Sequence, residues 1–407
     1  MQSPFKDLPR EVSILVAASF FVAVGFGIVL PAIPVFAKSF GVNNAAIGLM
    51  VSAFAITRFA SGLISGTLVD KFGERAVFSS GVFMVALFTF LAGLAQSYEQ
   101  LLIFRAAGGL GSSMFSVAAG SVIMRSVDDA HRGRAQSVYQ GSFLLGGIAG
   151  PAIGGLLSVI SLRAPFFVYS AMLLCSGTVA YFFLKGDKIG KVDKNVDTSE
   201  HTTVREALAM KSYRVALVLA FIGSWVFFGL RASILPIFVT EELKSTTAVV
   251  GYGLALSAII QGSILLRAGR FSDEKGRRAA SIIGAQVVLI ALLILTFSVH
   301  VWMYLISMAI LGFGGAFLST SPASIVGDVI KGKGGKVIAI FQMAGDAGMM
   351  VGPIVIGAIS DIYSYRTAFA LSAAIFLVSL VLVYQIPETR NVEEPQAKSL
   401  RPLDEDL

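Results

Sequence analysis

The sequence predicts an all-α polytopic membrane protein, with twelve transmembrane helices in two pseudo-symmetric six-helix bundles. The composition is 55% hydrophobic and 14% charged, whereas soluble domains carry about 25% charged residues. Apolar runs of roughly 20 residues, enough to cross a hydrocarbon core of ~30 Å, recur along the chain. A charged segment from the first half also returns in the second half.

Each apolar run is too long, and too rich in Leu, Ala and Gly, for a barrel strand of ~10 alternating residues. The first run also lacks the short apolar core and cleavage site of a signal peptide, so it is expected to stay as a helix. The expected spans are 12–37, 45–69, 76–96, 100–124, 135–160, 164–184, 213–239, 248–268, 279–299, 301–327, 337–362 and 366–386.

The positions of Lys and Arg predict the orientation, because short basic loops stay on the cytoplasmic side. Of the 32 basic residues, 25 fall in the two tails and in every second loop. The opposite loops hold only Lys38, Arg163, Lys244 and Arg366. Both termini are therefore expected in the cytoplasm, in a bacterial-type inner membrane. The net charge of +7 reflects this topology and does not indicate nucleic-acid binding.

One long polar segment interrupts the spans. Residues 185–212 form the expected cytoplasmic linker, with a short surface helix near Val204 to Met210. It separates an N-terminal six-helix bundle (1–184) from a C-terminal one (213–386), which a cytoplasmic tail (387–407) follows. Cys175 is the only cysteine, so the sequence predicts no intrachain disulfide and no thiolate metal site.

The two halves are internal repeats. "SGTLVDKFGERA" (65–76) and "AGRFSDEKGRRA" (268–279) align at a shift of 203, and Gly150–Pro151 aligns with Gly352–Pro353 at a shift of 202. Parallel repeats of this kind are a common construction in secondary transporters. The aligned loop residues are Gly66 with Gly269, Asp70 with Asp273, Gly73 with Gly276, and Arg75 with Arg278.

At these motifs the sequence resembles the major facilitator superfamily. "GTLVDKFGER" (66–75) resembles the family's loop motif G-x-L-x-D-R-x-G-R-R, with Lys71 and Glu74 as departures. "RAAGGLG" (105–111) is similar to the fourth-span motif R-x-x-x-G-x-G. "GGIAGPAIGG" (146–155) resembles the fifth-span motif that the family associates with antiporters, although Ser137 replaces its first glycine.

Glycines at a spacing of four allow helix backbones to approach closely. Gly62 with Gly66 is therefore expected to form one packing seam on which a bundle rocks. The other expected packing positions are Gly109, Gly111, Gly146, Gly150, Pro151, Gly154, Gly352 and Pro353. The resemblance implies that Asp70 helps to hold the cytoplasmic side shut, facing a helix N-terminus or Arg134.

Charges inside the spans are costly and are rarely kept without use. Asp346 is the only acidic residue well inside a span, and it is the candidate proton carrier; a structural ion pair with Arg105 or Arg58 is the alternative. The resemblance implies a role in proton transfer for Arg105, which could instead snorkel to the outer interface. Arg58 could serve binding or packing, and Arg231 could bind an anion or pair with Glu241 or Glu242.

Pro31 and Pro236 are expected to break the first and seventh spans around a central cavity. The candidate cavity residues are Arg58, Arg231, Phe26, Tyr139, Phe143, Trp225, Phe228, Gln261, Phe341 and Gln342.

The expected function is proton-coupled export of small, largely apolar compounds by a monomer, with protons and the lipid bilayer as its other partners. Carriage of an organic anion or metabolite is the rival, because three buried arginines face one aspartate. A non-transporting sensor and an enzyme are disfavoured. The three histidines lie in loops or at span ends, and neither a phosphate-binding loop nor a metal-ligand cluster is present. No cofactor is expected.

Overall fold

The computed structural model describes residues 9–127, 129–184, 202–329 and 335–389, and all of its regular structure there is helical. The first half contains α1 (Arg10–Val29), α2 (Ala32–Lys38), α3 (Asn44–Ala60), α4 (Gly62–Phe72), α5 (Glu74–Leu94), α6 (Tyr98–Ser126), α7 (Asp129–Ile160) and α8 (Ala164–Phe183). The second half contains α9 (Val204–Ala209), α10 (Lys211–Ser224), η1 (Trp225–Ile234), α11 (Leu235–Glu241), α12 (Thr247–Lys275), α13 (Arg277–Thr296), α14 (Val301–Val329), α15 (Gly335–Ile362) and α16 (Tyr365–Tyr384).

The helices account for the expected spans. In the described residues ten helical stretches are long and apolar enough to cross a membrane, and α3 with α4 forms an eleventh span that bends by 51°. The described stretch Gly150–Ile160 of α7 is also apolar, but the twelfth span as a whole stays a prediction. The short helix expected in the linker is confirmed as α9, whereas 185–201 and 390–407 lie outside the described residues.

Proline breaks one of the two spans in which a break was expected. The first span ends as α1 at Val29 and resumes as α2 after Pro31. In the seventh span the helix does not break at Pro236, which instead occupies the first turn of α11. The ten residues before it, Trp225–Ile234, form a π-helix. The π-helix continues directly into α11, so Pro236 lies within one uninterrupted helical span.

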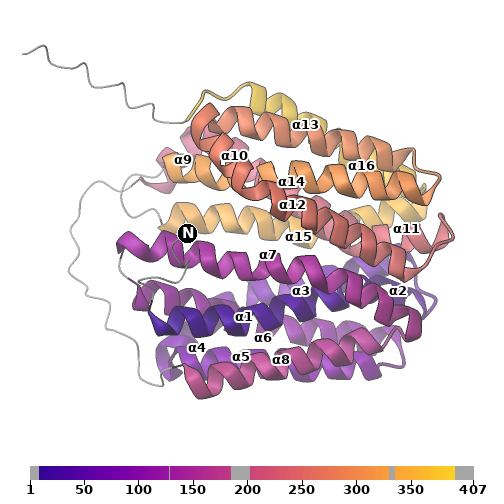
Figure 1. Cartoon of the computed structure of the whole chain (residues 1–407), viewed down its shortest axis with the longest axis horizontal. Coiled ribbons are helices and arrows are strands. Elements are labelled where there is room, and N and C mark those ends of the chain that lie inside the picture. Colours follow the sequence, from indigo (N-terminus) through magenta and orange to yellow (C-terminus); the bar gives the residue numbers. More distant parts are fainter. Residues whose placement is uncertain (1–8, 128, 185–201, 330–334, 390–407) are drawn as a thin grey trace, which may run out of the picture.

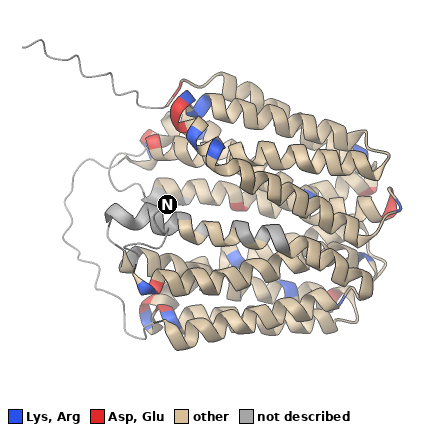
Figure 2. Ribbon diagram, in the orientation of Figure 1, with Lys and Arg blue, Asp and Glu red and all other residues tan. Residues whose placement is uncertain are grey.

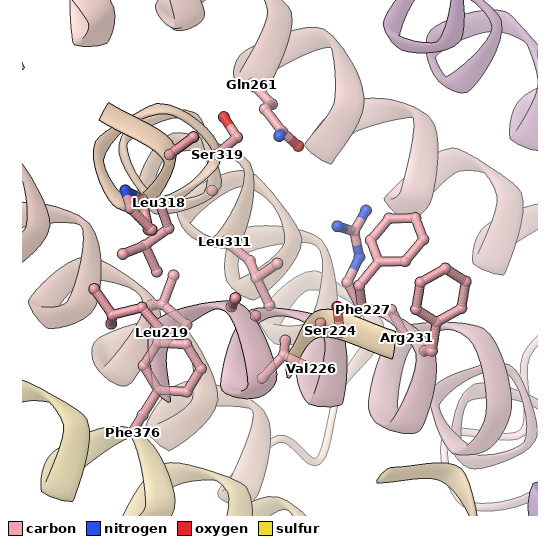
Figure 3. A pocket seen from close by; sticks show the side chains of 18 of the residues that line it. Leu219, Ser224, Val226, Phe227, Arg231, Gln261, Leu311, Leu318, Ser319 and Phe376 are labelled. Atoms are coloured by element: carbon pink, nitrogen blue, oxygen red, sulfur yellow. The ribbon is translucent and has the colours of Figure 1, made fainter. Parts of the chain in front are cut away.

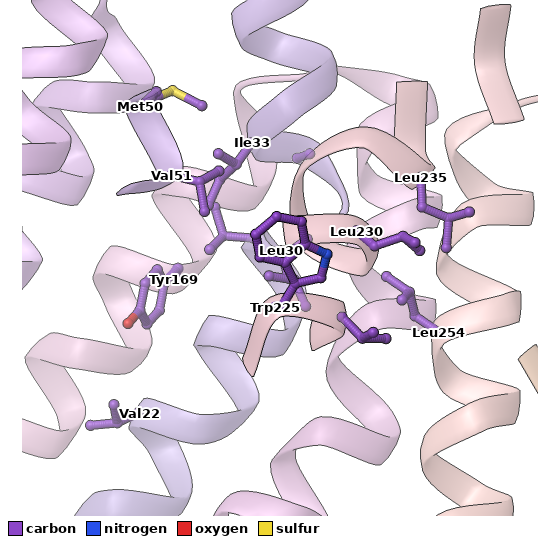
Figure 4. Packing of buried hydrophobic residues seen from close by; sticks show 14 of the residues in the cluster. Val22, Leu30, Ile33, Met50, Val51, Tyr169, Trp225, Leu230, Leu235 and Leu254 are labelled. Carbon is purple, nitrogen blue, oxygen red and sulfur yellow. The ribbon is translucent and has the colours of Figure 1, made fainter. Parts of the chain in front are cut away.

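The helices lie side by side in two groups (Figure 1). Helices α1 to α8 pack on one another, as do α10 to α16, and the two groups meet where α3 packs on α15 and α7 packs on α12. One apolar core runs through both groups (Figure 4), and in it Leu30 and Ile33 of the first half lie near Trp225 and Leu230 of η1.

Charged residues gather at the ends of the helices (Figure 2). We call the end at which α1 begins and α16 ends the basic end. The opposite end, which holds the turns after Lys38, Leu94, Ile160, Glu241, Thr296 and Ile362, is called the far end. Few charges lie between the two ends, as expected for helices that cross a hydrocarbon layer.

Most of the glycines predicted as packing positions lie at close contacts between helices. A Cβ added at Gly146, Gly150 or Gly154 of α7 would collide with the backbone of α1, so these two helices touch through their main chains. Gly109 packs on α3, Gly111 on α5 and Gly352 on η1 in the same way. Pro353 lies against Gly48 of α3, at the interface between the two groups.

The seam predicted at Gly62 and Gly66 is wrong for this conformation. An added Cβ at either glycine, or at Gly269, meets no described atom within 4 Å. These residues lie in the part of α4 and α12 nearest the basic end, where the two groups do not touch at these positions. The glycines that do touch across the groups, Gly48, Gly155, Gly251 and Gly357, lie toward the far end.

Candidate functional site

A cavity of about 380 Å³ lies within the second half of the chain. Its wall comes from α10, η1, α12, α13, α14, α15 and α16, and most of these helices present small or apolar side chains to it. Figure 3 shows the polar members around this space: the guanidinium of Arg231, the amide of Gln261, and the hydroxyls of Ser224 and Ser319. The cavity extends from Arg231 and Leu311 toward the basic end at Ala323 and Phe341.

Five of the predicted cavity residues line this space together: Phe228, Arg231, Gln261, Phe341 and Gln342. Trp225 does not, because its side chain is buried in the core and its indole Nε1 donates a hydrogen bond of 3.1 Å to Ser372 Oγ. Pocket residues that the sequence did not single out include Phe227, Ser224 and Ser319. Phe227 precedes Arg231 by four residues, a spacing that places two side chains on the same face of a helix.

The predicted cavity residues of the first half lie apart from this space. Phe26 lines a small void of about 20 Å³ together with Arg105. The rings of Tyr139 and Phe143 pack edge to face, with their centroids 5.4 Å apart. The positive charge of Arg58 also acts on the hydroxyl of Tyr139.

Arg231 is 8% exposed, and its guanidinium lies over the ring of Phe227, 5.1 Å from the ring centroid. Among the described residues, the Nε atom of Arg231 finds no hydrogen-bond partner. The expected alternative of a pair with Glu241 is wrong, because that carboxylate contacts Lys38 and Tyr365 instead. The guanidinium is therefore a buried cation on the wall of the cavity.

Arg105 occupies a similar setting in the first half. It is 9% exposed, and its guanidinium carbon lies 4.7 Å from the centroid of the Phe54 ring, which is itself 8% exposed. Tyr169 is its polar neighbour. Because both Arg105 and the ring under it are buried, the snorkelling alternative is wrong. The structure also does not bring Arg105 to Asp346, so the two predicted coupling residues lie apart.

Asp346 lies on α15 and Arg58 on α3, two helices that pack on each other between the two groups. Each side chain is partly buried, and the charge of Arg58 acts on the Asp346 carboxylate. In the described contacts they form no direct ion pair.

The repeated loop motif has the same geometry in both halves. Gly73 and Gly276 precede α5 and α13 with φ of +84° and +110°, which only glycine adopts without strain. Arg75 lies over the ring of Tyr181, 4.9 Å from its centroid, and Arg278 donates a hydrogen bond of 2.6 Å to the carbonyl of Tyr384. Both tyrosines lie at or near the ends of the last helices, α8 and α16.

Asp70 and Asp273 are the aligned acidic residues of the motif. Asp273 pairs with Arg277, whose Nε also lies 3.2 Å from Asp328 Oδ2. Asp70 is exposed near the end of α4. The side chain of Arg134, its proposed partner, lies outside the described residues, so this gate contact stays a prediction.

At the far end, polar contacts join the two groups. The Asp361 carboxylate accepts hydrogen bonds from the backbone N–H groups of Asn44 (2.9 Å) and Ala45 (2.7 Å). Across the groups, Lys38 Nζ lies 3.6 Å from Glu241 Oε1, and within the second half Tyr365 Oη donates to Glu241 Oε2 at 2.6 Å. The sequence did not predict these contacts, because each residue belongs to a span end that looks like an ordinary solvated turn.

A model of the major facilitator superfamily matches the chain twice, over residues 15–233 and 217–405. The chain belongs to the major facilitator superfamily. The double match agrees with the internal repeat, and the resemblance that the motifs indicated is confirmed.

Relatives and solved structures agree with this assignment. The chain is 26% identical to the multidrug resistance protein MdtG of Salmonella paratyphi C over 78% of its own length and 79% of that protein. It is 25% identical to multidrug resistance protein 1 of Bacillus subtilis, over 92% and 96%. The structure of a bacterial homologue of the lysosomal transporter Spinster, inward-facing and unoccupied, aligns with a TM-score of 0.77 at 16% identity, covering 92% of this chain and 97% of that one.

Proposed function

We propose that this member of the superfamily is a proton-coupled exporter of small, largely apolar compounds that works by alternating access. The observation that carries the proposal is the asymmetry of the helix packing. Polar and main-chain contacts join the two halves at the far end, whereas the cavity extends toward the basic end. A cavity sealed at one end is one of the two states that an alternating-access transporter needs.

The basic end is assigned to the cytoplasm by the positive-inside rule, so this conformation is inward-open. We therefore assign both termini to the cytoplasm, and we expect the protein to work as a monomer in a bacterial-type inner membrane. In the opposite state the basic end closes, and Gly62, Gly66 and Gly269 then become the packing seams that their spacing predicts.

We assign proton coupling to Asp346, whose carboxylate is within range of the Arg58 charge on the neighbouring helix α3. When the two side chains meet, the carboxylate is held ionised; when they separate, its burial favours the protonated form. Export is supported by the names of the relatives and by the apolar lining of the cavity, which offers few polar groups to a hydrophilic compound.

The test uses inside-out vesicles with an acidified interior and a dye that reports the proton gradient. A panel of neutral, cationic and anionic aromatic compounds is added, and those that the protein exports are expected to collapse the gradient with the wild type and not with Asp346→Asn. Glu99→Gln, which changes an exposed carboxylate at the far end, is the control and is expected to behave like the wild type. A gradient collapse by Asp346→Asn equal to that of the wild type would exclude this aspartate as the proton carrier.

Carriage of an organic anion is the second candidate. The cavity wall holds one charged side chain, Arg231, and no carboxylate among the described residues that line it. This positive charge disfavours a cationic compound and favours an anionic one.

A further inference from the structure

The cavity wall carries the positive charge of Arg231 and no negative charge among its described residues. Among its described lining residues, the polar side chains are Arg231, Gln261, Gln342, Ser224 and Ser319, and the rest are apolar or glycine. A buried cation costs several kcal/mol unless an anion or hydrogen-bond acceptors compensate it, so a cavity built only for apolar compounds gains nothing from an arginine.

The immediate neighbours of Arg231 do not supply the compensation. The ring of Phe227 offers only its face to the guanidinium, and Nε makes no hydrogen bond to a described residue. The nearby Tyr304 donates its hydroxyl proton to the carbonyl of Val250 at 3.0 Å, so it stays a neutral group. In the described part of the chain no carboxylate contacts Arg231, which leaves its donors available to a ligand.

The backbone around Arg231 is also unusual. It lies in the π-helix Trp225–Ile234, whereas the corresponding stretch of the first half is an ordinary part of α1. Under the repeat shift the residue near its counterpart position is Phe26, so the charge and the π-helix are both confined to the second half. π-Helical turns inside longer helices occur frequently at functional sites.

We propose that Arg231 binds the carboxylate of an amphipathic organic anion, whose apolar body occupies the rest of the cavity. This inference rests on the proposed function and names its substrate class. The guanidinium fork matches a carboxylate in geometry and charge. In Figure 3 the amide of Gln261 and the guanidinium of Arg231 border the same open space, so the amide supplies a further donor.

The cavity also offers an apolar region for the body of the ligand. Leu219, Phe341 and Phe376 line the cavity beyond the arginine. The volume of about 380 Å³ lies within the range of roughly 300–1,000 Å³ that is usual for small-molecule sites. A compound of one or two aromatic rings with an acidic group fits both the size and the charge.

The test measures binding to the purified wild type in detergent by calorimetry at pH 7.5. The three probes share one ring system: 2-naphthoate, its neutral amide 2-naphthamide, and the cation 2-naphthylmethylammonium, each titrated also into empty micelles. We expect the carboxylate to bind about tenfold or more tightly than the amide, which corresponds to one charge-assisted interaction, and the ammonium to bind weakest. An amide or ammonium that binds as tightly as the carboxylate overturns the proposal without any variant.

Variants then assign the preference to one side chain. Arg231→Gln is expected to bind the carboxylate and the amide equally, with its amide affinity unchanged; Arg231→Lys, which keeps the charge and loses the fork, should retain a reduced preference. Arg267→Gln removes an exposed arginine of α12 that is hydrogen-bonded to the carbonyl of Ser263 and should match the wild type. A carboxylate preference that persists undiminished in a folded Arg231→Gln or Arg231→Lys protein, judged by thermal melting, overturns the assignment.

These measurements separate the inference from the proposed function. Binding in detergent needs no proton gradient, so a carboxylate preference that depends on Arg231 stands even where Asp346→Asn still couples protons. Conversely, proton antiport through Asp346 with equal affinity for the three probes would retain the proposed function and exclude the anion site.

Discussion

The carboxylate of Asp361 caps the helix that begins at Asn44, and the two residues belong to different halves of the chain. Its oxygens accept hydrogen bonds from the backbone N–H groups of Asn44 and Ala45, at 2.9 and 2.7 Å. The first turn of a helix has unpaired N–H groups and a partial positive charge, which a carboxylate satisfies. Here the capping carboxylate comes from α15 in the other half of the chain. The cap of α3 therefore forms only when the two halves meet at the far end.

Asp361→Asn should therefore favour the outward-open state. The loss of a cap costs about 0.5–2 kcal/mol, which shifts the equilibrium roughly 2- to 30-fold. With Cys175 replaced by Ser, spin labels at Gln96 and Val299, two exposed residues in far-end turns of different halves, report the separation by electron paramagnetic resonance. The population at longer distance is expected to grow in the variant.

Glu99→Gln is the matched control, since Glu99 lies in the first turn of α6 and stays within its own half. Its distance distribution should equal that of the wild type. An unchanged distribution in Asp361→Asn would mean that the apolar and glycine contacts close the far end without the cap.

Tyr365 should contribute more to this closure than Lys38. The hydroxyl of Tyr365 contacts Glu241 at 2.6 Å and Asn44 Oδ1 at 3.5 Å, and its side chain is buried. The Lys38–Glu241 pair is partly exposed, and exposed ion pairs contribute at most about 1 kcal/mol. In the same distance measurement, Tyr365→Phe is expected to open the far end further than Lys38→Met, and the reverse order would contradict the burial argument.

The sequence predicted the helical fold from composition and run length, and the repeat from the two charged loops. Those features are local or periodic, so one chain read in order is enough to see them. The repeat also holds in contacts that were not foreseen, since Arg75 meets Tyr181 and Arg278 meets Tyr384 at the same shift of 203.

The site was predicted less completely, because its geometry depends on how the helices pack. Arg231 and Gln261 were identified as cavity residues, whereas Phe227 was not, and the π-helix that contains Arg231 and Phe227 has no visible signal in the sequence. Asp361 was not singled out, and Glu241 was considered only as a partner of Arg231, because a charge at a span end is normally solvated. Only the approach of the other half turns them into closing contacts.

Alanine at the two motif glycines should destabilise the protein unequally. Both positions have positive φ, and a side chain there costs about 1–3 kcal/mol. At Gly276 an added Cβ would also strike the carboxylate of Glu388, which accepts hydrogen bonds from the N–H groups of Arg277 and Arg278. Around Gly73 the described space is open.

Thermal melting in detergent is expected to rank Gly276→Ala below Gly73→Ala, and both below the wild type. Gly62→Ala serves as the control, because Gly62 has an ordinary helical backbone and open space around it. It should be neutral or slightly stabilising. Equal melting of Gly276→Ala and the wild type would show that Glu388 and the turn adjust without cost.

The charges of Arg58 and Asp346 should be coupled in stability as well as in transport. Neutralising either side chain alone leaves the other charge in the interior without its counter-charge, whereas removing both leaves no charge to compensate. Arg58→Gln/Asp346→Asn is therefore expected to melt above both single variants, with a coupling free energy of about 1–3 kcal/mol. The same double variant should still bind substrate in detergent and fail to move protons. Additive effects of the two single changes on melting would mean that the two charges act independently, and would limit Arg58 to a packing role.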